Sequence, residues 1–434
     1  IIEYIVRLKG HGNVRTCIII YQAGGSACLI MKGLCILMKI TKNLSGLSKN
    51  EIRSTYFSNM KPILNDRAMF ADATEEYRSP EEPSAGDIVK LKFRTAKYNV
   101  DRVEVVVNGI AYSMKKFMTN TNFDYYIAEF TLGAQRTEYY FHALVGRTSI
   151  YYNQAGPYRE LNPTYNFVIN PGFKTPDWAK GAVIYQIYVD RFHNGDKSND
   201  VVDNEYVHIG EPVHRITDWN EYPATMDVRN FYGGDLQGVL DKMDYLESLG
   251  IDAIYFNPLF VSPSNHKYDI QDYDYIDPHF GVIVNDGGEP LPDNARSNDN
   301  ATKYKKRVTD YANLEASNEF FAKLVEEAHR RNIKVIIDGV FNHCGSFNKW
   351  LDRERIYEGS EGFDKGAYVD KESPYHDFFK FQDDYAWPYN QSYLGWWGHD
   401  TLPKLNYEGS KKLEDYILGI AKKWVSPPYN VDGW

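Results

Sequence analysis

The sequence predicts a multidomain chain in which an amino-terminal antiparallel β-sandwich precedes a parallel β-sheet covered by helices. Apolar and polar residues alternate with period two between residues 87 and 169, as in half-buried strands. From residue 182 onward, short apolar runs alternate with segments of helical period, as in α/β domains. The length of 434 residues also exceeds that of most single domains. We therefore divide the chain into residues 1–59, 60–172 and 173–434.

The sandwich is predicted from short strands that follow one another closely. Every second residue is apolar in the first two of them (Val89, Leu91, Phe93; then Val103, Val105, Val107), and Asn108-Gly109 marks a turn. Further runs lie at 123–130, 138–145, 149–153 and 165–169. Closely spaced strands without a helical period indicate a sandwich of about 100 residues. Asn170-Pro171-Gly172 ends it.

The parallel sheet is predicted from three continuous apolar runs, at 182–189, 251–256 and 333–337. We expect a helix from the N-cap Asp235 to Gly250, a second helix around 321–328 and a third over 411–424. Such alternation forms a parallel sheet that is either doubly wound or closed into a barrel. Residues 341–408, rich in Tyr, Trp and Asp, interrupt it as an insertion after the third strand.

Residues 1–59 differ from the rest in charge. They carry eight Lys and Arg and two acids, a net of +6, whereas the other 375 residues carry 41 bases and 57 acids, a net of −16. We expect this leader to be foreign to the fold, which would then start near Met60. The alternative is a native export signal of lipoprotein type, because residues 25–28 read Gly-Ser-Ala-Cys.

The composition excludes several classes of protein. A net charge of −10 argues against a general nucleic-acid or membrane-surface binder, and no run of about 20 apolar residues predicts a membrane span. The body holds one cysteine, Cys344, which suits a reducing compartment, so we expect a cytoplasmic protein. Export or lipid anchoring is the alternative if residues 1–59 are a native signal. Aromatic residues make up 15% of the chain, and their rings pack in cores or stack on flat ligands.

Polar and aromatic residues follow each predicted parallel strand, where the sites of such sheets lie. The third strand leads into Asp338-x-x-x-Asn342-His343, and the second leads to His266-Lys267-Tyr268-Asp269. Phe231-Tyr232-Gly233-Gly234-Asp235-Leu236, Ile276-Asp277-Pro278-His279-Phe280-Gly281 and Leu402-Pro403-Lys404-Leu405-Asn406 complete an ordered set. Each motif alone is weak, because an Asp at a strand end is about as often structural as catalytic. In this order they resemble the α-amylase family of retaining glycosidases and transglycosidases, and most closely its neopullulanase and cyclomaltodextrinase branch.

The resemblance covers residues 69–434 and implies an incomplete (β/α)8 barrel with a small domain inserted after strand three. It also implies that residues 60–172 are a starch-binding-type domain. Tyr268 would be the ring on which a glucose unit stacks, with His266 beside it. His343 would hydrogen-bond a hydroxyl of that sugar, and Asp338 would support the site by pairing with an Arg on the next strand. Trp396 or Trp397 would line the cleft or pack in the core.

A calcium site is a second expectation. Asn194, Asp196, Asn199 and Asp200 supply four oxygen-bearing side chains within seven residues, and oxygen ligands suit Ca²⁺ rather than zinc. The resemblance adds the Gly233 carbonyl and the Asp235 carboxylate. By composition alone such a cluster is more often a solvated turn. Asp235 is also the predicted helix cap, so its two roles compete.

The resemblance implies an enzyme that hydrolyses, or transfers from, α-1,4 bonds of maltooligosaccharides, cyclodextrins or pullulan, with α-1,6 bonds left open. In the family the nucleophile is the Asp of an Arg-x-Asp directly after a segment like 431–434. We therefore expect an amino-terminal fragment, inactive as a hydrolase, in which no residue is the catalytic carboxylate; Asp432 matches a position upstream of the nucleophile. The expected partners are α-glucan oligosaccharides or polysaccharides, and a homodimer of the full-length protein is left open. The alternative is a non-catalytic α-glucan-binding protein.

Overall fold

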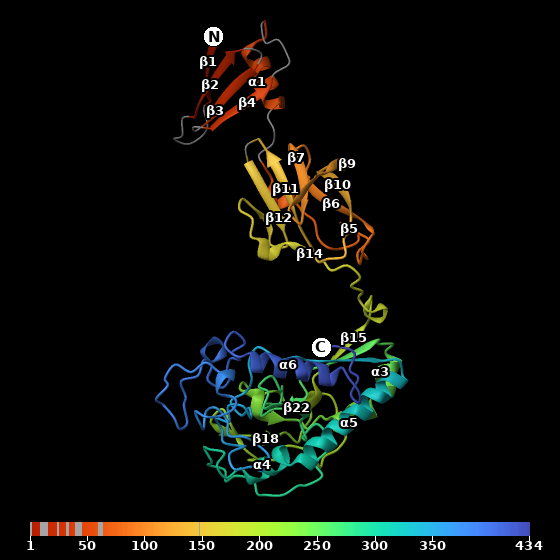
Figure 1. The fold of residues 1–434 in the computed structure, drawn as a ribbon, viewed down its shortest axis with the longest axis vertical. Coiled ribbons are helices and arrows are strands. Elements are labelled where there is room, and N and C mark those ends of the chain that lie inside the picture. Colours follow the sequence, from red (N-terminus) through yellow and green to blue (C-terminus); the bar gives the residue numbers. More distant parts are fainter. Residues whose placement is uncertain are drawn as a thin grey trace. The chain divides into compact units, whose positions relative to one another are not determined.

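The computed structural model describes residues 2–8, 16–23, 26–31, 34–39, 46–59, 64–146 and 148–434 (Figure 1). Before residue 46 and over 56–59 only the backbone is described. The chain divides into two compact units, Ile1–Pro176 and Asp177–Trp434, so the boundary lies slightly beyond the predicted one at residue 172. Among the described helices, none has the length and apolar character needed to cross a bilayer.

The leader contains regular structure. An antiparallel sheet runs in chain order through β1 (Ile2–Leu8), β2 (Thr16–Ala23), β3 (Ser26–Met31) and β4 (Leu34–Lys39). Helix α1 (Lys49–Asn59) follows, and Ser48 and Glu51 form a capping box at its start, with Ser48 N donating to Glu51 Oε2 at 2.8 Å. The side chain of Cys28, on which the export-signal alternative depends, lies outside the described residues. The foreign origin of the leader therefore stays a prediction.

Residues 64–176 form the predicted antiparallel sandwich. One sheet has the order β5 (Arg78–Ser79), β6 (Ile88–Ala96), β10 (Phe123–Thr131) and β9 (Lys115–Thr119). The other has the order β13 (Gly156–Tyr158), β12 (Thr148–Asn153), β11 (Thr137–Val145), β7 (Arg102–Val107) and β8 (Ile110–Ser113), and β14 (Phe167–Ile169) also pairs with β11. The short strands β5, β8, β9 and β13 were not predicted, because so few residues carry no readable period.

The core of the sandwich lies on the alternating residues that predicted it. Val89, Leu91 and Phe93 are fully buried, whereas Ile88, on the other face of the same strand, is 58% exposed. The Phe93 and Phe141 rings join the two sheets, with centroids 4.7 Å apart. The predicted turn at Asn108-Gly109 has positive φ at both residues, as a type I′ hairpin requires.

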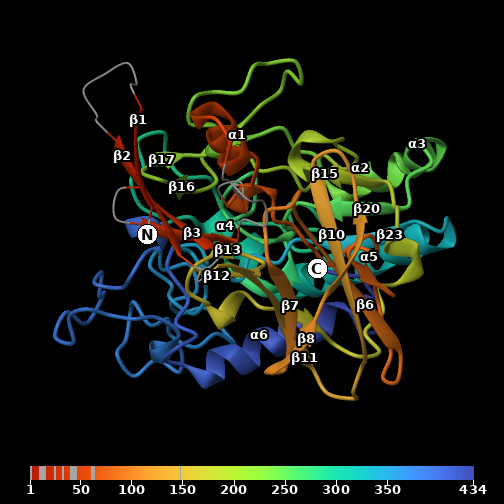
Figure 2. The ribbon, with the colours of Figure 1, turned by 90° about the horizontal axis from the view of Figure 1, so that it is seen from above.

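The second unit is built on a parallel sheet of three strands, β15 (Ile184–Ile187), β20 (Ala253–Phe256) and β23 (Lys334–Ile337), which lie side by side in that order (Figure 2). The covering helices are α2 (Leu236–Asp241), α3 (Met243–Ser248), α4 (Thr302–Thr309), α5 (Tyr311–Arg330) and α6 (Lys411–Trp424). One helix was predicted over 235–249; it breaks at Lys242, whose φ of −102° and ψ of 7° are not helical. Gly433 forms a parallel bridge with Ile336, so the sheet continues beyond β23.

Loops between these elements carry short strands and turns. Three two-stranded sheets pair β16 (Val207–His208) with β17 (Glu211–Pro212), β18 (His214–Arg215) with β19 (Asn230–Phe231), and β21 (Phe260–Val261) with β22 (Asp272–Ile276). Residues 341–408, all described, contain only 3-10 turns and isolated bridges, which matches the predicted break in the alternation.

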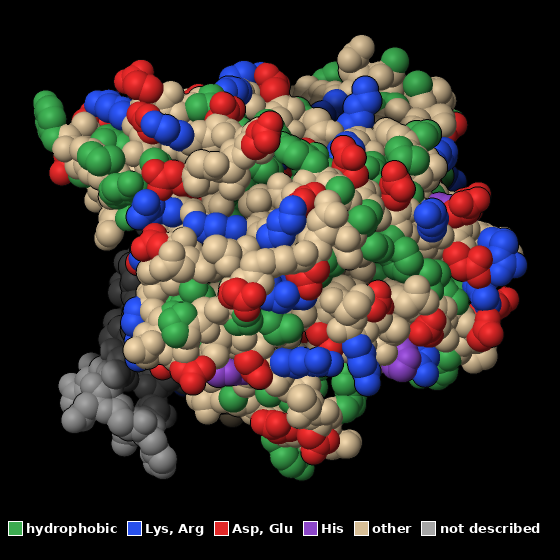
Figure 3. All heavy atoms as spheres, turned by 90° about the horizontal axis from the view of Figure 1, so that it is seen from below, with side chains coloured by type: hydrophobic (Ala, Val, Ile, Leu, Met, Phe, Trp, Pro, Cys, Tyr) green, Lys and Arg blue, Asp and Glu red, His purple; other side chains and the backbone are tan. Residues whose placement is uncertain are grey.

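On the face in Figure 3, Lys and Arg side chains are mixed with Asp and Glu.

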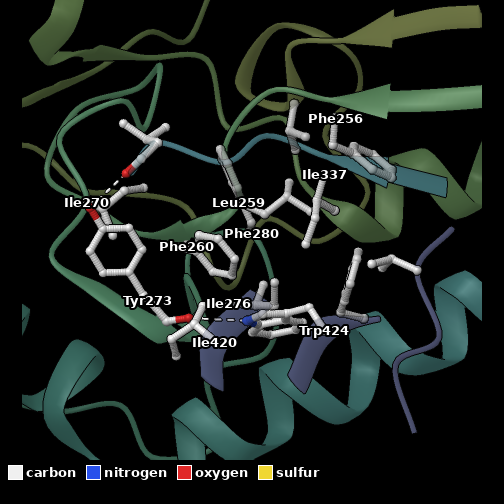
Figure 4. Close-up of a cluster of buried hydrophobic side chains, with 14 of the residues drawn as sticks. Phe256, Leu259, Phe260, Ile270, Tyr273, Ile276, Phe280, Ile337, Ile420 and Trp424 are labelled. Atoms are coloured by element: carbon white, nitrogen blue, oxygen red, sulfur yellow. Dashed lines mark hydrogen bonds between the residues drawn. The ribbon is translucent and has the colours of Figure 1, made fainter. Parts of the chain in front are cut away.

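The core of the second unit joins the sheet to α5 and α6 through aromatic side chains. Trp424 on α6 is fully buried, its ring lies 5.1 Å from that of Phe260, and its indole N–H donates to the Tyr273 carbonyl at 3.2 Å (Figure 4). The apolar faces of β20 and β23 pack into the same cluster through Phe256 and Ile337. This core fixes the carboxyl ends of the parallel strands, where the candidate site lies.

Candidate functional site

The four predicted substrate residues meet at the carboxyl ends of β20 and β23. Asp338 directly follows β23, and the loop after β20 carries His266 and Tyr268. The Tyr268 hydroxyl donates to Asp338 Oδ2 at 2.8 Å, which joins the ends of the two strands. The predicted convergence of these motifs is therefore present in the structure, whereas their roles toward a sugar stay predictions.

Two phenols share the Asp338 carboxylate. Burial and then the neighbouring Asp338 charge raise the pKa of Tyr268 above its usual value, and the same two causes raise the pKa of Tyr255 on β20 to about 12. Both phenols therefore stay protonated near neutral pH and act as donors. Tyr255 was not singled out from the sequence, although its place one residue before the end of an apolar strand is a signal that would have identified it.

His266 presents a defined nitrogen to the site. The Tyr268 backbone N–H donates to His266 Nδ1 at 3.0 Å, and Ser264 Oγ lies 3.1 Å from the same atom. Because Nδ1 accepts from this N–H, the ring nitrogen left to donate to a ligand oxygen is Nε2, which has no hydrogen-bond partner among the residues that the structure describes. The His266 and Tyr268 rings are 5.9 Å apart and inclined by 37°, so they adjoin without stacking face to face.

His343 is tied to the same loop. Its Nε2 donates to the Tyr268 carbonyl at 3.2 Å, and burial lowers its pKa, which favours the neutral ring. The structure shows this nitrogen bonded to backbone, and the predicted hydrogen bond from His343 to a sugar hydroxyl stays a prediction. The Trp396 ring stacks on His343 at 4.6 Å, and Trp397 stacks on Trp396 at 4.2 Å and is 80% exposed. Three stacked rings therefore lead from the site to solvent.

Asp432 holds the sheet together. Its Oδ2 accepts from the Val335 N–H at 2.9 Å and faces His329 Nε2 at 2.7 Å, and its Oδ1 lies 2.9 Å from Lys334 Nζ. Burial alone would raise the pKa of Asp432, but these partners outweigh it and lower the pKa. Asp432 is thus a structural carboxylate, as expected from its position upstream of the family's nucleophile.

The predicted calcium ligands fall into two groups. Asn194 Nδ2 donates to Asp200 Oδ1 at 2.7 Å, and a Cβ added to Gly233 would lie 2.4 Å from that oxygen, so these three residues adjoin. The Asn194 and Asn199 Oδ1 atoms are buried without a hydrogen-bond partner, and Asp200 Oδ2 contacts the Arg215 guanidinium. Buried unpaired oxygens next to a buried carboxylate are what a hard cation needs.

The other two residues already have partners. Asp235 caps α2 by accepting from Gly238 N at 2.6 Å, and it also accepts from Gly195 N and Asp196 N. Asp196 accepts from the backbone and hydroxyl of Ser198 within its own turn. In the described part of the chain no three His, Cys, Asp or Glu side chains gather as a metal centre, so the candidate depends on the Asn oxygens and on backbone.

Comparison with family models decides the family. The model "Alpha amylase, catalytic domain" matches residues 186–300 and 294–434, and "Alpha amylase, N-terminal ig-like domain" matches residues 82–170. The chain belongs to the α-amylase family. The resemblance inferred from the strand-end motifs is thereby confirmed, and the two models place an Ig-like domain before a catalytic domain.

Two of the curated relatives bear the names of that branch. The chain is 34% identical to a cyclomaltodextrinase of Thermoanaerobacter pseudethanolicus over 80% of this chain and 52% of the relative. It is 31% identical to neopullulanase 2 of Thermoactinomyces vulgaris over 85% of this chain and 54% of the relative. A solved cyclomaltodextrinase structure is 27% identical, with a TM-score of 0.49, over 85% of this chain and 55% of that one. The chain therefore spans about half the length of these two curated relatives, and it spans 20% of an amylopullulanase of Thermoanaerobacter thermohydrosulfuricus to which it is 34% identical.

Proposed function

We propose that this chain supplies the glucan-binding part of a retaining glycosidase that acts on α-linked glucose polymers. The observation that carries the proposal is the Tyr268–Asp338 pair, flanked by His266, at the ends of β20 and β23. A half-buried phenol ring bordered by fixed donors suits a glucose unit, which has an apolar face and a rim of hydroxyls. Relatives named for cyclomaltodextrins and pullulan support this substrate class.

The ring stack on His343 extends the proposed binding path. Trp397 is exposed and its ring stacks on that of Trp396. It offers a second flat surface for another sugar of the same oligosaccharide. Trp397 has a φ of +51°, a conformation that non-glycine residues adopt only where their surroundings impose it. Glucose units at Tyr268 and at Trp397 would belong to one oligosaccharide.

Bond cleavage requires more than this site presents. Retaining hydrolysis needs two carboxyl groups about 5–5.5 Å apart. Of the residues gathered here, Asp338 bears the carboxylate facing Tyr268, whereas Asp269 is buried, accepts from Ser262 Oγ and contacts Ser264 Oγ. We propose that hydrolysis or transfer belongs to the whole protein, and that the chain described here binds glucan without cleaving it.

The open sheet supports an incomplete (β/α)8 barrel with residues 341–408 inserted after β23. The first strand leaves Val183 and Ile184 more than half exposed, at 55% and 52%, which a closed barrel would cover. On the other side of the sheet, the isolated parallel bridge between Ile336 and Gly433 supports a fourth strand beside β23.

Calorimetric titration with maltoheptaose, alongside a reducing-sugar assay, tests the proposal. We expect saturable binding and no release of reducing ends. Cleavage by this chain would contradict the division of labour, and the absence of binding would contradict the proposed function altogether. Cleavage by a longer protein containing this chain would support the enzyme, and binding without cleavage by that longer protein would favour the non-catalytic alternative.

The sandwich offers a separate place for glucan. A cavity of about 360 Å³ on its six-stranded sheet is lined by Tyr140, Arg136, Glu138 and Asn108, with Asn166 beside them. The Arg136–Glu138 ion pair at 3.0 Å and the unpaired Oδ1 of Asn166 present donors and acceptors next to an aromatic ring. We propose that this cavity gives the sandwich a starch-binding role, and Tyr140→Ala should weaken the retention of the chain on insoluble starch while Tyr112→Ala should not.

We also propose that Ca²⁺ binds at Asn194, Asn199, Asp200 and the Gly233 carbonyl. The unpaired oxygens of Asn194 and Asn199 support this proposal, because a buried oxygen without a partner is costly and a cation would satisfy it. Asp235 keeps its position as the helix cap and orients the loop that bears Asp196. When bound, the ion would supply positive charge that fixes this loop; it would not take part in bond cleavage.

A further inference from the structure

Lys267, which lies between the two predicted substrate residues His266 and Tyr268, has an unusual environment. Its side chain is 1% exposed, and its ammonium donates to Asp277 Oδ2 at 2.6 Å and to the Ser262 carbonyl at 2.8 Å. The ammonium also lies 4.8 Å from the centre of the Phe280 ring. Lysine is among the residues least often fully buried. The carboxylate, the carbonyl and the aromatic ring around this ammonium therefore indicate a specific role for Lys267.

The backbone at Lys267 is also unusual. Its φ is +62°, in the left-handed region that favours glycine. This turn sends the chain from His266 to Tyr268 so that the Tyr268 N–H reaches back to His266 Nδ1. A non-glycine residue holds such a conformation only where its surroundings over-determine it. The buried ammonium supplies that restraint from within the turn itself.

Asp277, which holds the ammonium, is fixed in turn by a buried row of alternating charges. His279 lies between Asp277 and Glu205, at 2.8 Å from an oxygen of each. Glu205 accepts from Arg307 on α4 at 2.9 Å, and Arg307 also pairs with Asp286. Burial disfavours a charged imidazole, but the two carboxylates outweigh it and raise the pKa of His279. The row therefore ties the substrate loop to helix α4.

We propose that Lys267 is a positioning residue that holds Tyr268 and His266 in their binding geometry through its buried bond to Asp277. The inference rests on the proposed glucan-binding function. Without the ammonium, the turn at residue 267 loses the contact that selects its left-handed conformation. Tyr268 then leaves Asp338, and the Tyr268 and His266 rings lose their relative placement.

The test removes the ion pair while avoiding an uncompensated buried charge. Lys267→Met alone would leave the buried Asp277 carboxylate without the lysine cation. The main variant is therefore Lys267→Met/Asp277→Asn, in which the amide oxygen of the new Asn side chain still faces His279. The matched control is Lys349→Met/Asp272→Asn/Asp274→Asn, because the buried Lys349 ammonium pairs with both carboxylates, at 2.7 and 2.6 Å, and neither pair involves any of the four candidate residues. Maltoheptaose affinity is measured by calorimetry, and thermal unfolding is measured for every variant.

The dissociation constant should rise about tenfold or more in the Lys267 variant, since small displacements of binding groups are costly, and should change less than about twofold in the control. Unchanged affinity in the Lys267 variant would overturn the inference, and so would an equal loss in the control. If the unmodified chain binds no maltoheptaose, the proposed function fails, and a crystal structure of the Lys267 variant then decides the inference. Loss of the Tyr268–Asp338 contact would uphold it, and an intact contact would overturn it.

Discussion

Replacement of Tyr268 separates the contribution of its ring from that of its hydroxyl. The hydroxyl donates one hydrogen bond to Asp338 at 2.8 Å, and the carboxylate keeps Tyr255 as a neighbour in its absence. A hydrogen bond to a charged group contributes about 1.5–3 kcal/mol, and the partial exposure of this pair places it at the lower end. Tyr268→Phe should therefore lower the free energy of unfolding by about 1.5 kcal/mol and leave the stacking surface in place.

Removal of the Tyr268 ring should weaken maltoheptaose binding. Stacking on an aromatic ring is worth about 0.5–1.5 kcal/mol beyond the contribution of the area it buries. With the buried area included, we expect Tyr268→Ala to weaken the free energy of maltoheptaose binding by about 2 kcal/mol, which is roughly a thirtyfold rise in dissociation constant. Maltoheptaose titration calorimetry measures this, with Tyr245→Ala, 49% exposed on α3, as the control that should not change affinity. Equal affinity in the Ala variant and the unmodified chain would refute the reasoning, as would a Phe variant as weak as the Ala variant.

Further predictions concern stability and metal binding. Trp424→Ala, which removes a fully buried ring and its bond to Tyr273, should lower the free energy of unfolding by about 3–5 kcal/mol in urea titrations, and a loss below about 1 kcal/mol would contradict the packing. In the folded chain the pKa of Asp432 lies below its ordinary value of 3.8. The ionised carboxylate therefore stabilises the fold above pH 3.8, and this stabilisation is lost as pH falls through the folded pKa. In acid-unfolding measurements, the free energy of unfolding of Asp432→Asn should fall less steeply with decreasing pH than that of the unmodified chain. An equal slope in the two proteins would contradict this role of Asp432. Calcium should raise the melting temperature of the chain after treatment with EDTA, and Asp200→Asn should abolish the rise; a rise that persists in the variant would place the ion elsewhere.

The sequence was most informative where burial imposes a local period. The alternation of Val89, Leu91 and Phe93 predicted β6 because half-buried strands have one apolar face, and the runs at 251–256 and 333–337 predicted β20 and β23. The motif order placed Asp338 beside Tyr268 because parallel strands end at one edge of a sheet. These are consequences of local pattern and connectivity.

Other features depend on contacts between distant residues. The break at Lys242 leaves no signal in an unbroken run of helical period. The bond of His343 Nε2 to the Tyr268 carbonyl joins residues 75 positions apart, so a motif cannot reveal that this nitrogen already has a partner. The Asp235 carboxylate accepts from the N–H groups of residues 195, 196 and 238, and only the folded loop brings these three groups together.

A crystal structure of the chain with maltoheptaose tests the central claim most directly, because it locates the sugar rather than only its affinity. The account predicts a glucose unit on the Tyr268 ring, within hydrogen-bond reach of His266 Nε2, and the oligosaccharide continuing toward Trp397. Sugar bound only in the cavity of the sandwich, with none on the Tyr268 ring at saturating maltoheptaose, would contradict it.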